Sequence, residues 1–487
     1  MKKQNFQYRD FIILSSILLL AFVFRLYKIN SPLADLHSWR QSDTAAVARN
    51  FTRDGIDLLH PKYDDLSGRE AGKENPEGYR MVEFPIYNSL FAISYRLMPN
   101  FSLDIHGRLV SIFFSLIIIG IIYYLLFKET GSRLAAIMGS FVYSVFPFFV
   151  FFSRVILPET TAVGLTFLSI LFLYLYTDKD ISRLKEITYL TLSLIFFALG
   201  LLVKPTIIFY ALVLAYLFFR KRGFKTFKNL DAYLYFILTF VPFILWRQYI
   251  KNFPEGIPAS DWLITSVNTY QGLKTIFLRP AFFRWIFFER LNHMILGGYM
   301  SVFLLLGILR KKSKYFFHSF LIGIILYLFI FEGGNVQHEY YQTMILPTIA
   351  IFIGLGIDFL WSIRKNLISP LSMIIITTII FSASFFFSYY TIREFYSVPN
   401  DLTTIAKIIK TITGPTDKII TDRLGDTTLL YLADRKGWPA YSENLDYLKA
   451  KGYKYFITAS KDLILEFKSG KTHKVVFEND QFSIFSL

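Results

Sequence analysis

The sequence predicts an all-α polytopic membrane protein with about eleven transmembrane helices and a small α/β domain at its C-terminal end. Of the 487 residues, 54% are hydrophobic and 18% are charged, whereas roughly a quarter of a typical soluble domain is charged. The apolar residues form long uncharged blocks, which a bilayer requires and a soluble core rarely uses. From Ser397 to Leu487, in contrast, charge is spread throughout. This pattern excludes disorder, a collagen-like fibre and an ordinary soluble enzyme.

The chain is basic and has no cysteine. Lys and Arg number 52 against 36 Asp and Glu, which gives a formal net charge of +16. In a soluble protein this excess indicates nucleic-acid binding, but in a membrane protein it follows from topology, so we expect no nucleic-acid partner. The absence of cysteine excludes disulfide bonds, a thiolate zinc site and a Cys nucleophile.

The predicted crossings begin with the apolar block Phe11–Tyr27, which follows Lys2, Lys3 and Arg9. A cleaved signal peptide begins in the same way, but no small-x-small cleavage site follows, so we expect a retained helix. Ten further blocks are candidates for crossings: Leu109–Phe127, Leu134–Phe152, Thr160–Tyr176, Ile187–Val203, Thr206–Phe219, Ala232–Ile250, Met294–Leu309, Phe316–Phe331, Thr343–Trp361 and Leu371–Tyr390.

Cations are concentrated in alternate loops. The cationic loops are 128–133, 179–185, 220–228, 310–314 and 364–365, while the short intervening turns offer Arg154, Lys204 and little else. Because cytoplasmic loops are enriched in Lys and Arg, we expect the N-terminus in the cytoplasm and, after an odd number of crossings, the C-terminus outside. We therefore expect a transmembrane domain over residues 1–396, with a long outer loop at 29–107, and a soluble extracytoplasmic domain over 397–487.

The C-terminal segment alternates helical and strand patterns, which is typical of a small α/β module. It shows no glycine-rich phosphate loop and no catalytic constellation. The expected helices are Leu402–Ile412 and Thr427–Leu432, and the expected strands are Lys418–Ile420, Tyr453–Thr458 and a terminal hairpin of Lys474–Phe477 with Phe482–Phe485.

On this topology the unusual polar residues all fall on the outer face. Charges at a bilayer boundary are costly unless they are paired, solvated or used. Residues from five separate loops therefore indicate a polar cavity that opens to the outer leaflet. They are Asp35, His37, Trp39, Arg40, Gln41, Asp43, Glu83, Arg154, Glu159, Lys204, His338, Tyr340 and Tyr341.

Each of these residues also has an ordinary structural explanation. Lys204 and Arg154 suit interfacial cations at helix ends, and Glu159 after a proline suits a helix cap. The remaining alternatives are a solvated Glu83, a loop histidine at His338, interface anchors at Tyr340 and Tyr341, and an i, i+3 ion pair between Arg40 and Asp43.

The chemistry that such a cavity suits is group transfer from a lipid phosphate. A carboxylate in a basic, partly desolvated cavity deprotonates a hydroxyl. Several cations hold a phosphate leaving group and neutralise its developing charge. A donor with a lipid tail and a phosphate head fits a cavity at the membrane boundary. No P-loop, Rossmann glycine pattern, HExxH or GxSxG motif offers a soluble alternative.

Several segments carry a family resemblance. They are Asp35-Leu-His-Ser-Trp-Arg-Gln-Ser-Asp43, Glu83-Phe-Pro-Ile-Tyr, the Arg154 to Glu159 turn, Lys204-Pro205 and His338-Glu-Tyr-Tyr. In this arrangement, over about Phe11 to Trp361, the chain resembles the GT-C superfamily of integral-membrane glycosyltransferases. The bacterial branch related to protein O-mannosyltransferases and aminoarabinose transferases, glycosyltransferase family 39-like, is the most similar.

The resemblance implies a function and roles for these residues. It implies inverting transfer of one sugar from a polyprenyl-phosphate sugar to an extracytoplasmic glycan, lipid or protein, at a bacterial inner or plasma membrane. Asp43 falls at the position of the general base, with Asp35 as the other candidate. Lys204, Arg154, Arg40 and His338 would face the donor phosphate. The other outer-face residues named above, among them His37, Trp39, Gln41, Glu83, Glu159, Tyr340 and Tyr341, would line the cavity.

The chain departs from the family at one point. Many relatives carry two adjacent acidic residues here, whereas this chain has Arg40 and Gln41 followed by the single Asp43. Paired carboxylates are the usual ligands of hard cations, so no cofactor is expected to be required and the use of a divalent metal stays open. The alternatives are an outer-leaflet glycan ligase, a flippase or transporter for polyprenyl-linked glycans, and a membrane scaffold.

Overall fold

The structure is a computed structural model that describes residues 6–258, 279–310, 315–364, 368–441, 444–470 and 473–487. The chain divides into two compact units. Unit 1 contains Met1–Ile29, Arg108–Arg247 and Asp261–Glu394, and unit 2 contains Asn30–Gly107, Gln248–Ser260 and Phe395–Leu487. The compact units thus group the first long loop with the C-terminal segment. The expected domains at 1–396 and 397–487 stay a prediction.

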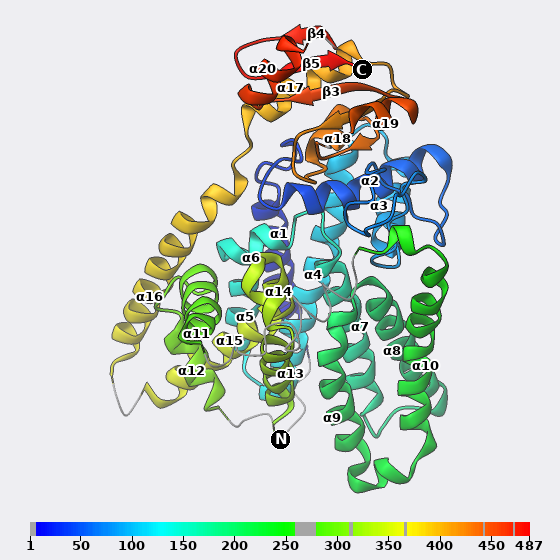
Figure 1. The fold of residues 1–487 in the computed structure, drawn as a ribbon. Coiled ribbons are helices and arrows are strands. Elements are labelled where there is room, and N and C mark those ends of the chain that lie inside the picture. The colour runs from blue at the N-terminus through cyan, green and yellow to red at the C-terminus, as the bar shows by residue number, and fades with distance from the viewer. Residues whose placement is uncertain (1–5, 259–278, 311–314, 365–367, 442–443, 471–472) are drawn as a thin grey trace. The chain divides into compact units, whose positions relative to one another are not determined.

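All the regular secondary structure among the described residues of unit 1 is helical (Figure 1). The long helices are α1 (Tyr8–Arg25), α4 (Leu103–Thr130, which begins in unit 2), α7 (Glu159–Tyr176), α8 (Arg183–Val203), α10 (Leu230–Tyr249), α15 (Leu346–Ile363) and α16 (Pro370–Ile392). The shorter ones are α5 (Arg133–Val145), α6 (Pro147–Phe152), η1 (Pro205–Tyr210), α9 (Ala211–Arg222), η2 (Gly223–Lys228), α11 (Pro280–Phe283), η7 (Arg284–Ile295), α12 (Ser301–Ile308), α13 (Phe316–Ile330), α14 (Glu332–Gln337) and η8 (Glu339–Met344).

Six stretches of the described chain are long and apolar enough to cross a membrane, and two shorter apolar helices accompany them. All the apolar blocks predicted from the sequence coincide with helices, but several of these helices are interrupted. The block Leu134–Phe152 breaks at Phe146, because Pro147 opens a new helix there. The block Thr206–Phe219 begins as the 3₁₀ helix η1 after Lys204. The expected count of about eleven crossings therefore stays a prediction.

Glycines let three helices of unit 1 approach closely. A Cβ added at Gly356 of α15 would lie 1.8 Å from the carbonyl oxygen of Phe303 in α12. A Cβ at Gly354, on the same helix, would lie 2.5 Å from the carbonyl oxygen of Ala135 in α5. Small residues at helix interfaces allow such backbone contact in membranes. Helix α15 is therefore packed between α12 and α5 through its glycines.

Unit 2 combines loop-borne helices with a five-stranded sheet in the order β2-β1-β3-β5-β4. The strands β1, β2 and β3 are parallel neighbours, while β5 is antiparallel to β3 and β4. The strands are β1 (Lys418–Thr421), β2 (Gly437–Trp438), β3 (Tyr453–Thr458), β4 (Lys474–Glu478) and β5 (Ser483–Ser486). The helices are α2 (Ser38–Asp54), α3 (Ile86–Leu97), η3 (Ile250–Asn252), η4 (Pro254–Gly256), η10 (Arg393–Tyr396, which begins in unit 1), α17 (Asn400–Ile412), α18 (Thr428–Ala433), α19 (Leu445–Ala450) and α20 (Lys461–Ser469).

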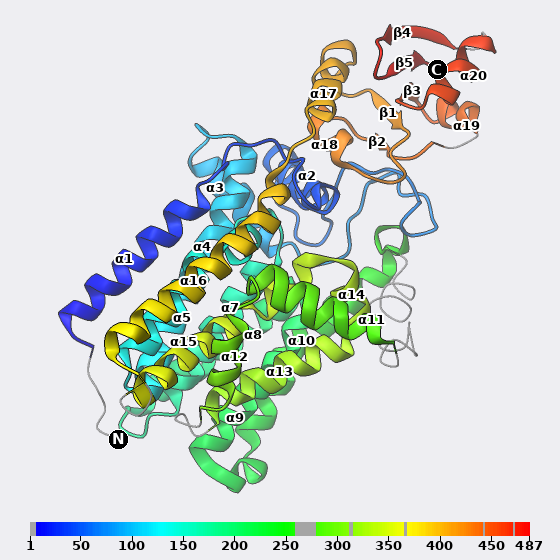
Figure 2. The same cartoon turned by 90° about the vertical axis from the view of Figure 1, so that its left-hand side faces the viewer.

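Side chains of the strands alternate between two cores, as the period of a strand requires. Ile419 packs with α17 and α18, whereas the next residue, Ile420, packs with α19 and α20. Figure 2 shows α17 and α20 on opposite sides of the sheet. The helices and strands predicted from the sequence for this segment are confirmed, with boundaries shifted by one or two residues.

The first loop covers one edge of this sheet. Gly437 of β2 donates its N–H to the carbonyl of Asp64 at 2.9 Å and accepts from the N–H of Leu66 at 2.8 Å. Ala34 of the same loop lies in the core beside α17. An uncovered strand edge invites pairing with another chain, and the loop removes that edge here. The loop and the C-terminal segment therefore fold together.

Candidate active site

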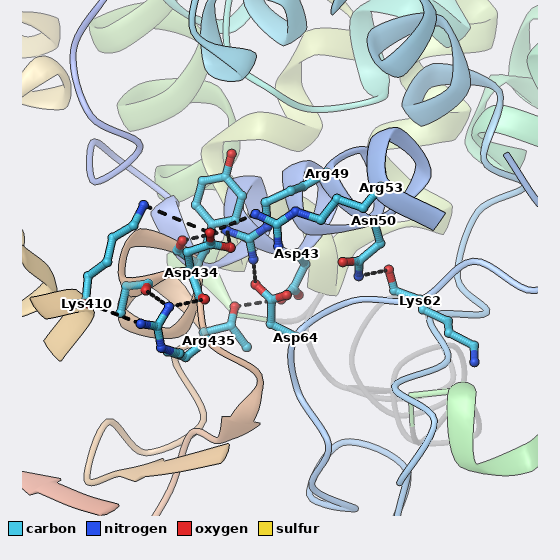
Figure 3. Close-up of polar contacts among 12 residues, drawn as sticks. Asp43, Arg49, Asn50, Arg53, Lys62, Asp64, Lys410, Asp434 and Arg435 are labelled. Carbon is cyan, nitrogen blue, oxygen red and sulfur yellow. Dashed lines mark hydrogen bonds and ion pairs between the residues drawn. The ribbon is translucent and has the colours of Figure 1, made fainter. Parts of the chain in front are cut away.

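Helix α2 carries the acidic candidate Asp43, which is buried with 1% of its surface exposed. One carboxylate oxygen lies 2.9 Å from the Arg80 guanidinium. The other accepts the hydroxyl hydrogen of Thr427, which precedes α18, at 2.6 Å. The predicted base is thus held by one group from the first loop and one from the C-terminal segment. Figure 3 shows Asp43 on α2 among the charged residues of this region.

The environment of Asp43 suits proton transfer near neutral pH. Burial raises the pKa of Asp43 from 3.8 to about 6, against the opposing charge of Arg80 and the Thr427 hydrogen bond. The negative charge of Glu70 raises it further. A general base works best with a pKa near the operating pH. Asp43 is therefore charged at neutral pH and still basic enough to accept a proton.

The neighbours predicted around Asp43 take two further pairings. Arg40 forms an ion pair with Glu83, whose side chain is 13% exposed. The Gln41 amide donates to Asp35 at 2.7 Å and to the Leu36 carbonyl at 2.9 Å, so Asp35 is held within the loop that enters α2. The alternative of a freely solvated Glu83 is wrong.

Two aromatic residues predicted for the cavity lie at the start of α2. His37 precedes the helix in the left-handed region, with φ of 57°, a conformation uncommon outside glycine. Trp39 accepts a hydrogen bond from Thr427 through its carbonyl at 3.2 Å. Thr427 therefore contacts both the start of α2 and the carboxylate of Asp43.

Sequence reasoning missed the residues that surround Asp43. Arg80 also pairs with Glu70 and lies 5.0 Å from the centre of the Tyr63 ring. The hydroxyl of the same Tyr63 lies 3.5 Å from the Asp65 carboxylate. Burial raises the pKa of Asp65 to about 7. The loop that carries these residues has neither helical nor strand periodicity, so no pattern in it identified them.

A second polar cluster lies in unit 1. Lys204 follows α8 and pairs with Glu159, the first residue of α7, at 2.7 Å. The Lys204 ammonium also lies 5.5 Å from the centre of the Tyr341 ring, a cation–π contact. Lys204 is 8% exposed and Glu159 1%. Burial and pairing distinguish this lysine from a cation that reaches out to solvent.

The segment before α15 supplies the rest of this cluster. The His338 ring stacks on Tyr340 with centroids 5.3 Å apart and planes 10° apart, and Tyr340 lies 4.4 Å from Tyr341. Arg290 of η7, which sequence reasoning missed, pairs with Glu339. The structure thus brings His338, Tyr340 and Tyr341 together, with Tyr341 against Lys204.

Arg154 takes a position that the sequence did not predict. Its guanidinium is fully buried and donates to the carbonyls of Tyr27 and Lys28 at 2.9 and 3.2 Å, just after α1. Arg25 at the end of α1 likewise donates to the carbonyls of Tyr143 and Ser144. The carbonyl groups at the end of a helix have no hydrogen-bond donor within the helix. These arginines supply donors to carbonyl groups at and just beyond such ends. Arg154 therefore anchors the chain after α1, while its predicted role toward a phosphate stays a prediction.

The described residues contain no group of three or more His, Asp or Glu side chains arranged to hold a metal ion. This finding concerns only the ranges given above.

Comparisons with known proteins agree with the fold. The family model for dolichyl-phosphate-mannose-protein mannosyltransferases matches residues 84–246. No curated protein matches the chain. The structure of ArnT from Cupriavidus metallidurans bound to undecaprenyl phosphate superposes with a TM-score of 0.68 at 13% identity, covering 98% of this chain and 97% of that chain. The archaeal oligosaccharyltransferase AglB from Archaeoglobus fulgidus, in complex with an inhibitory peptide and a dolichol-phosphate, gives 0.54 at 12% identity, covering 95% and 70%.

The fold and the site define a helical membrane protein in which a carboxylate of helix α2 is buried beside a cation. The chain shares the fold of ArnT, and its residues 84–246 match the mannosyltransferase family model. The resemblance indicated by the sequence is thereby confirmed.

Proposed function

We propose that the protein transfers a single sugar, with inversion, from a polyprenyl-phosphate sugar to an acceptor outside the cytoplasm, with Asp43 as general base. The observation that carries this proposal is the burial of Asp43 between Arg80 and Thr427, which gives the carboxylate a pKa of about 6. The shared fold with ArnT, solved with undecaprenyl phosphate, supports the class of donor.

In this proposal Asp43 takes the proton of the acceptor hydroxyl or amine. The nucleophile then attacks the anomeric carbon from the face opposite the phosphate, and the polyprenyl phosphate leaves. Cations stabilise the charge that develops on a leaving phosphate. Lys204 serves that purpose, because its pairing with Glu159 and its contact with Tyr341 hold the ammonium in one place.

The test is a transfer assay on the purified full-length protein in lipid. A panel of radiolabelled polyprenyl-monophosphate sugars is offered to the wild-type protein and to Asp43→Asn. We expect transfer or hydrolysis of one donor, reduced by about 10²–10⁴-fold in Asp43→Asn, as for a lost general base. Thermal unfolding checks that the variant is folded. Near-normal turnover by a folded Asp43→Asn protein would remove Asp43 from the role.

A second candidate is an oligosaccharide ligase that uses a polyprenyl diphosphate. The fold shared with the oligosaccharyltransferase AglB favours it. The same assay separates the two functions when diphosphate-linked oligosaccharides are added to the panel. Transfer of a whole glycan from a diphosphate, with no turnover of any monophosphate donor, would establish the ligase instead.

A further inference from the structure

Unit 2 contains a cavity of about 350 Å³ that the proposed transfer does not use. One side consists of residues of α2 and the first loop, and the other consists of residues that lead into β1, the first residue of β1, and the residues 434–436 that follow α18. Six cationic and three acidic side chains line it, hence a formal charge of +3. Figure 3 shows Arg49, Arg53, Asp434 and Arg435 of this lining together.

Three of the six cations are neutralised by the acids. Arg49 pairs with Asp64 from the first loop and, at 3.1 Å, with Asp434 at the end of α18. Arg53, one turn further along α2, pairs with Asp434 at 2.7 Å. A fourth pair joins Lys62 to Glu77 at 2.5 Å. The two pairs with Asp434 join helix α2 to the C-terminal segment, and the four pairs together involve all the acids of the cavity.

The other three cations have no carboxylate within ion-pair distance among the residues that the structure describes. Arg435 is 4% exposed, and its guanidinium donates to neutral oxygens, including the Thr413 hydroxyl at 2.8 Å and the Thr413 carbonyl at 2.7 Å. Lys436 is next in the chain and half-buried, and Lys418 lies 5.6 Å from the centre of the Tyr453 ring. A contact that only holds the first loop against the C-terminal segment needs equal numbers of cationic and acidic side chains. Three extra cations around one cavity repel one another unless an anion is bound.

The rest of the lining limits what the anion is attached to. Leu66, Pro76 and Pro415 give the cavity apolar walls beside the cations. The volume lies in the range of small-molecule sites, roughly 300–1,000 Å³. A sugar ring offers apolar C–H faces to such walls, and its phosphate offers charge to the lysines. A bare phosphate would use only the cations.

Helix α18 connects this cavity to the proposed base. Thr427 at its beginning binds Asp43, and Asp434 at its end binds Arg49 and Arg53. Its six residues span roughly 9 Å at the rise of an α-helix. The distance between a group bound in the cavity and the Asp43 carboxylate is therefore about the length of a short saccharide.

We propose that this cavity binds the phosphate group of a phosphorylated saccharide and so anchors the acceptor. The acceptor role rests on the proposed glycosyl transfer, whereas binding itself does not. Lys418 and Lys436 supply the charge that the ion pairs leave over, and Arg435 fixes the backbone beside them.

The test is direct binding to the full-length protein in lipid, measured by calorimetry without any donor. The probes are N-acetylglucosamine 1-phosphate, N-acetylglucosamine and inorganic phosphate. The variant Lys418→Gln/Lys436→Gln removes two of the three cations that lack a carboxylate partner, keeps Arg435 and leaves the ion pairs intact. Its matched control is Lys449→Gln/Lys461→Gln, which removes the same charge from exposed positions outside the cavity. Thermal unfolding checks that both variants fold.

We expect the sugar phosphate to bind more tightly than either other probe. Loss of two charge-assisted contacts should weaken it by at least about tenfold in the cavity variant, with the control unchanged. Equal affinity of the two variants, or of the sugar phosphate and the neutral sugar, would overturn the proposal. Inorganic phosphate binding as tightly as the sugar phosphate would overturn the saccharide assignment. If the protein binds the sugar phosphate but transfers from no donor, the proposed function fails and this binding site stands.

Discussion

Replacement of Arg80 provides the sharpest test of the proposed base. The guanidinium lies 2.9 Å from Asp43 and opposes the effect of burial on its pKa, which is about 6 with Arg80 in place. An opposite charge at this distance lowers a carboxyl pKa by roughly 1–3 units. In Arg80→Gln the pKa of Asp43 should therefore rise to about 7–9.

The magnitude follows from the fraction of Asp43 that is ionised. With a pKa of about 6, the carboxylate is almost fully ionised at pH 7. With a pKa of about 8, only about a tenth is ionised. We therefore expect kcat/KM of Arg80→Gln at about pH 7 to fall roughly tenfold and to recover toward pH 9, because the acid limb of the pH–rate profile moves upward.

The assay is initial-rate sugar transfer between about pH 5 and pH 9.5, at limiting donor, so that kcat/KM reports the free enzyme. Arg80→Lys keeps a positive charge and should keep the limb near pH 6. Thr427→Val, which removes the hydrogen bond to Asp43 together with the contact to the Trp39 carbonyl, should shift the limb upward by less than Arg80→Gln. It serves as the second variant if Arg80→Gln does not fold.

One result would refute the reasoning. A loss of activity in Arg80→Gln that is the same at every pH, in a protein that unfolds at the wild-type temperature, would show that Arg80 does not set the pKa of the group that limits the rate. Asp35, held by Gln41, would then be the next candidate for the base.

The remaining predictions concern donor binding and stability. Lys204→Ala should weaken donor binding by at least about tenfold. The charge-balanced Glu159→Gln/Lys204→Met should restore thermal stability without restoring affinity for the donor. Unchanged donor affinity of Lys204→Ala in a binding assay would count against the phosphate role. Burial raises the pKa of Asp65 from 3.8 to about 7, so the folded state keeps a proton that the unfolded state releases. The free energy of unfolding should therefore fall as pH rises from about 4 to 7, by at most about 4 kcal/mol. In Asp65→Asn the melting temperature should lack this dependence on pH. Gly437→Ala would place its Cβ 2.1 Å from the Ile419 carbonyl oxygen and should cost about 1–3 kcal/mol in thermal unfolding; a wild-type melting temperature would contradict the close approach.

The helices and strands that follow a regular sequence pattern could be predicted from the sequence. Apolar blocks of about 20 residues specify helices, because an unpaired backbone group is costly in lipid. The alternation of Ile419 and Ile420 between two cores is the same period that indicated a strand there. The break at Phe146 was marked by Pro147, yet the surrounding apolar residues outweighed that signal in the prediction.

The surroundings of the candidate base could not be predicted in this way. Asp43 was found through its motif, but Arg80 and Thr427 are far from it in the sequence and lie in segments without a periodic pattern. The first loop folds against the edge of β2 through backbone hydrogen bonds at Gly437, which no side-chain pattern specifies. Contacts of this kind depend on the tertiary fold alone.

Thr427 connects the C-terminal segment directly to the carboxylate of Asp43. A soluble domain attached to a membrane enzyme is expected to fold and act separately. Here the hydroxyl of Thr427 binds Asp43, and Asp434 at the other end of α18 binds Arg49 of the same helix α2. Both ends of α18 are therefore fixed to the helix that carries the proposed base. A change at the sheet that displaces α18 would remove a hydrogen bond that favours the ionised carboxylate, and it would thereby raise the pKa of Asp43. The C-terminal segment is thus part of the environment that sets the pKa of Asp43, and if Asp43 is the base, variants in the core beside α18 should alter the pH dependence of transfer as well as stability.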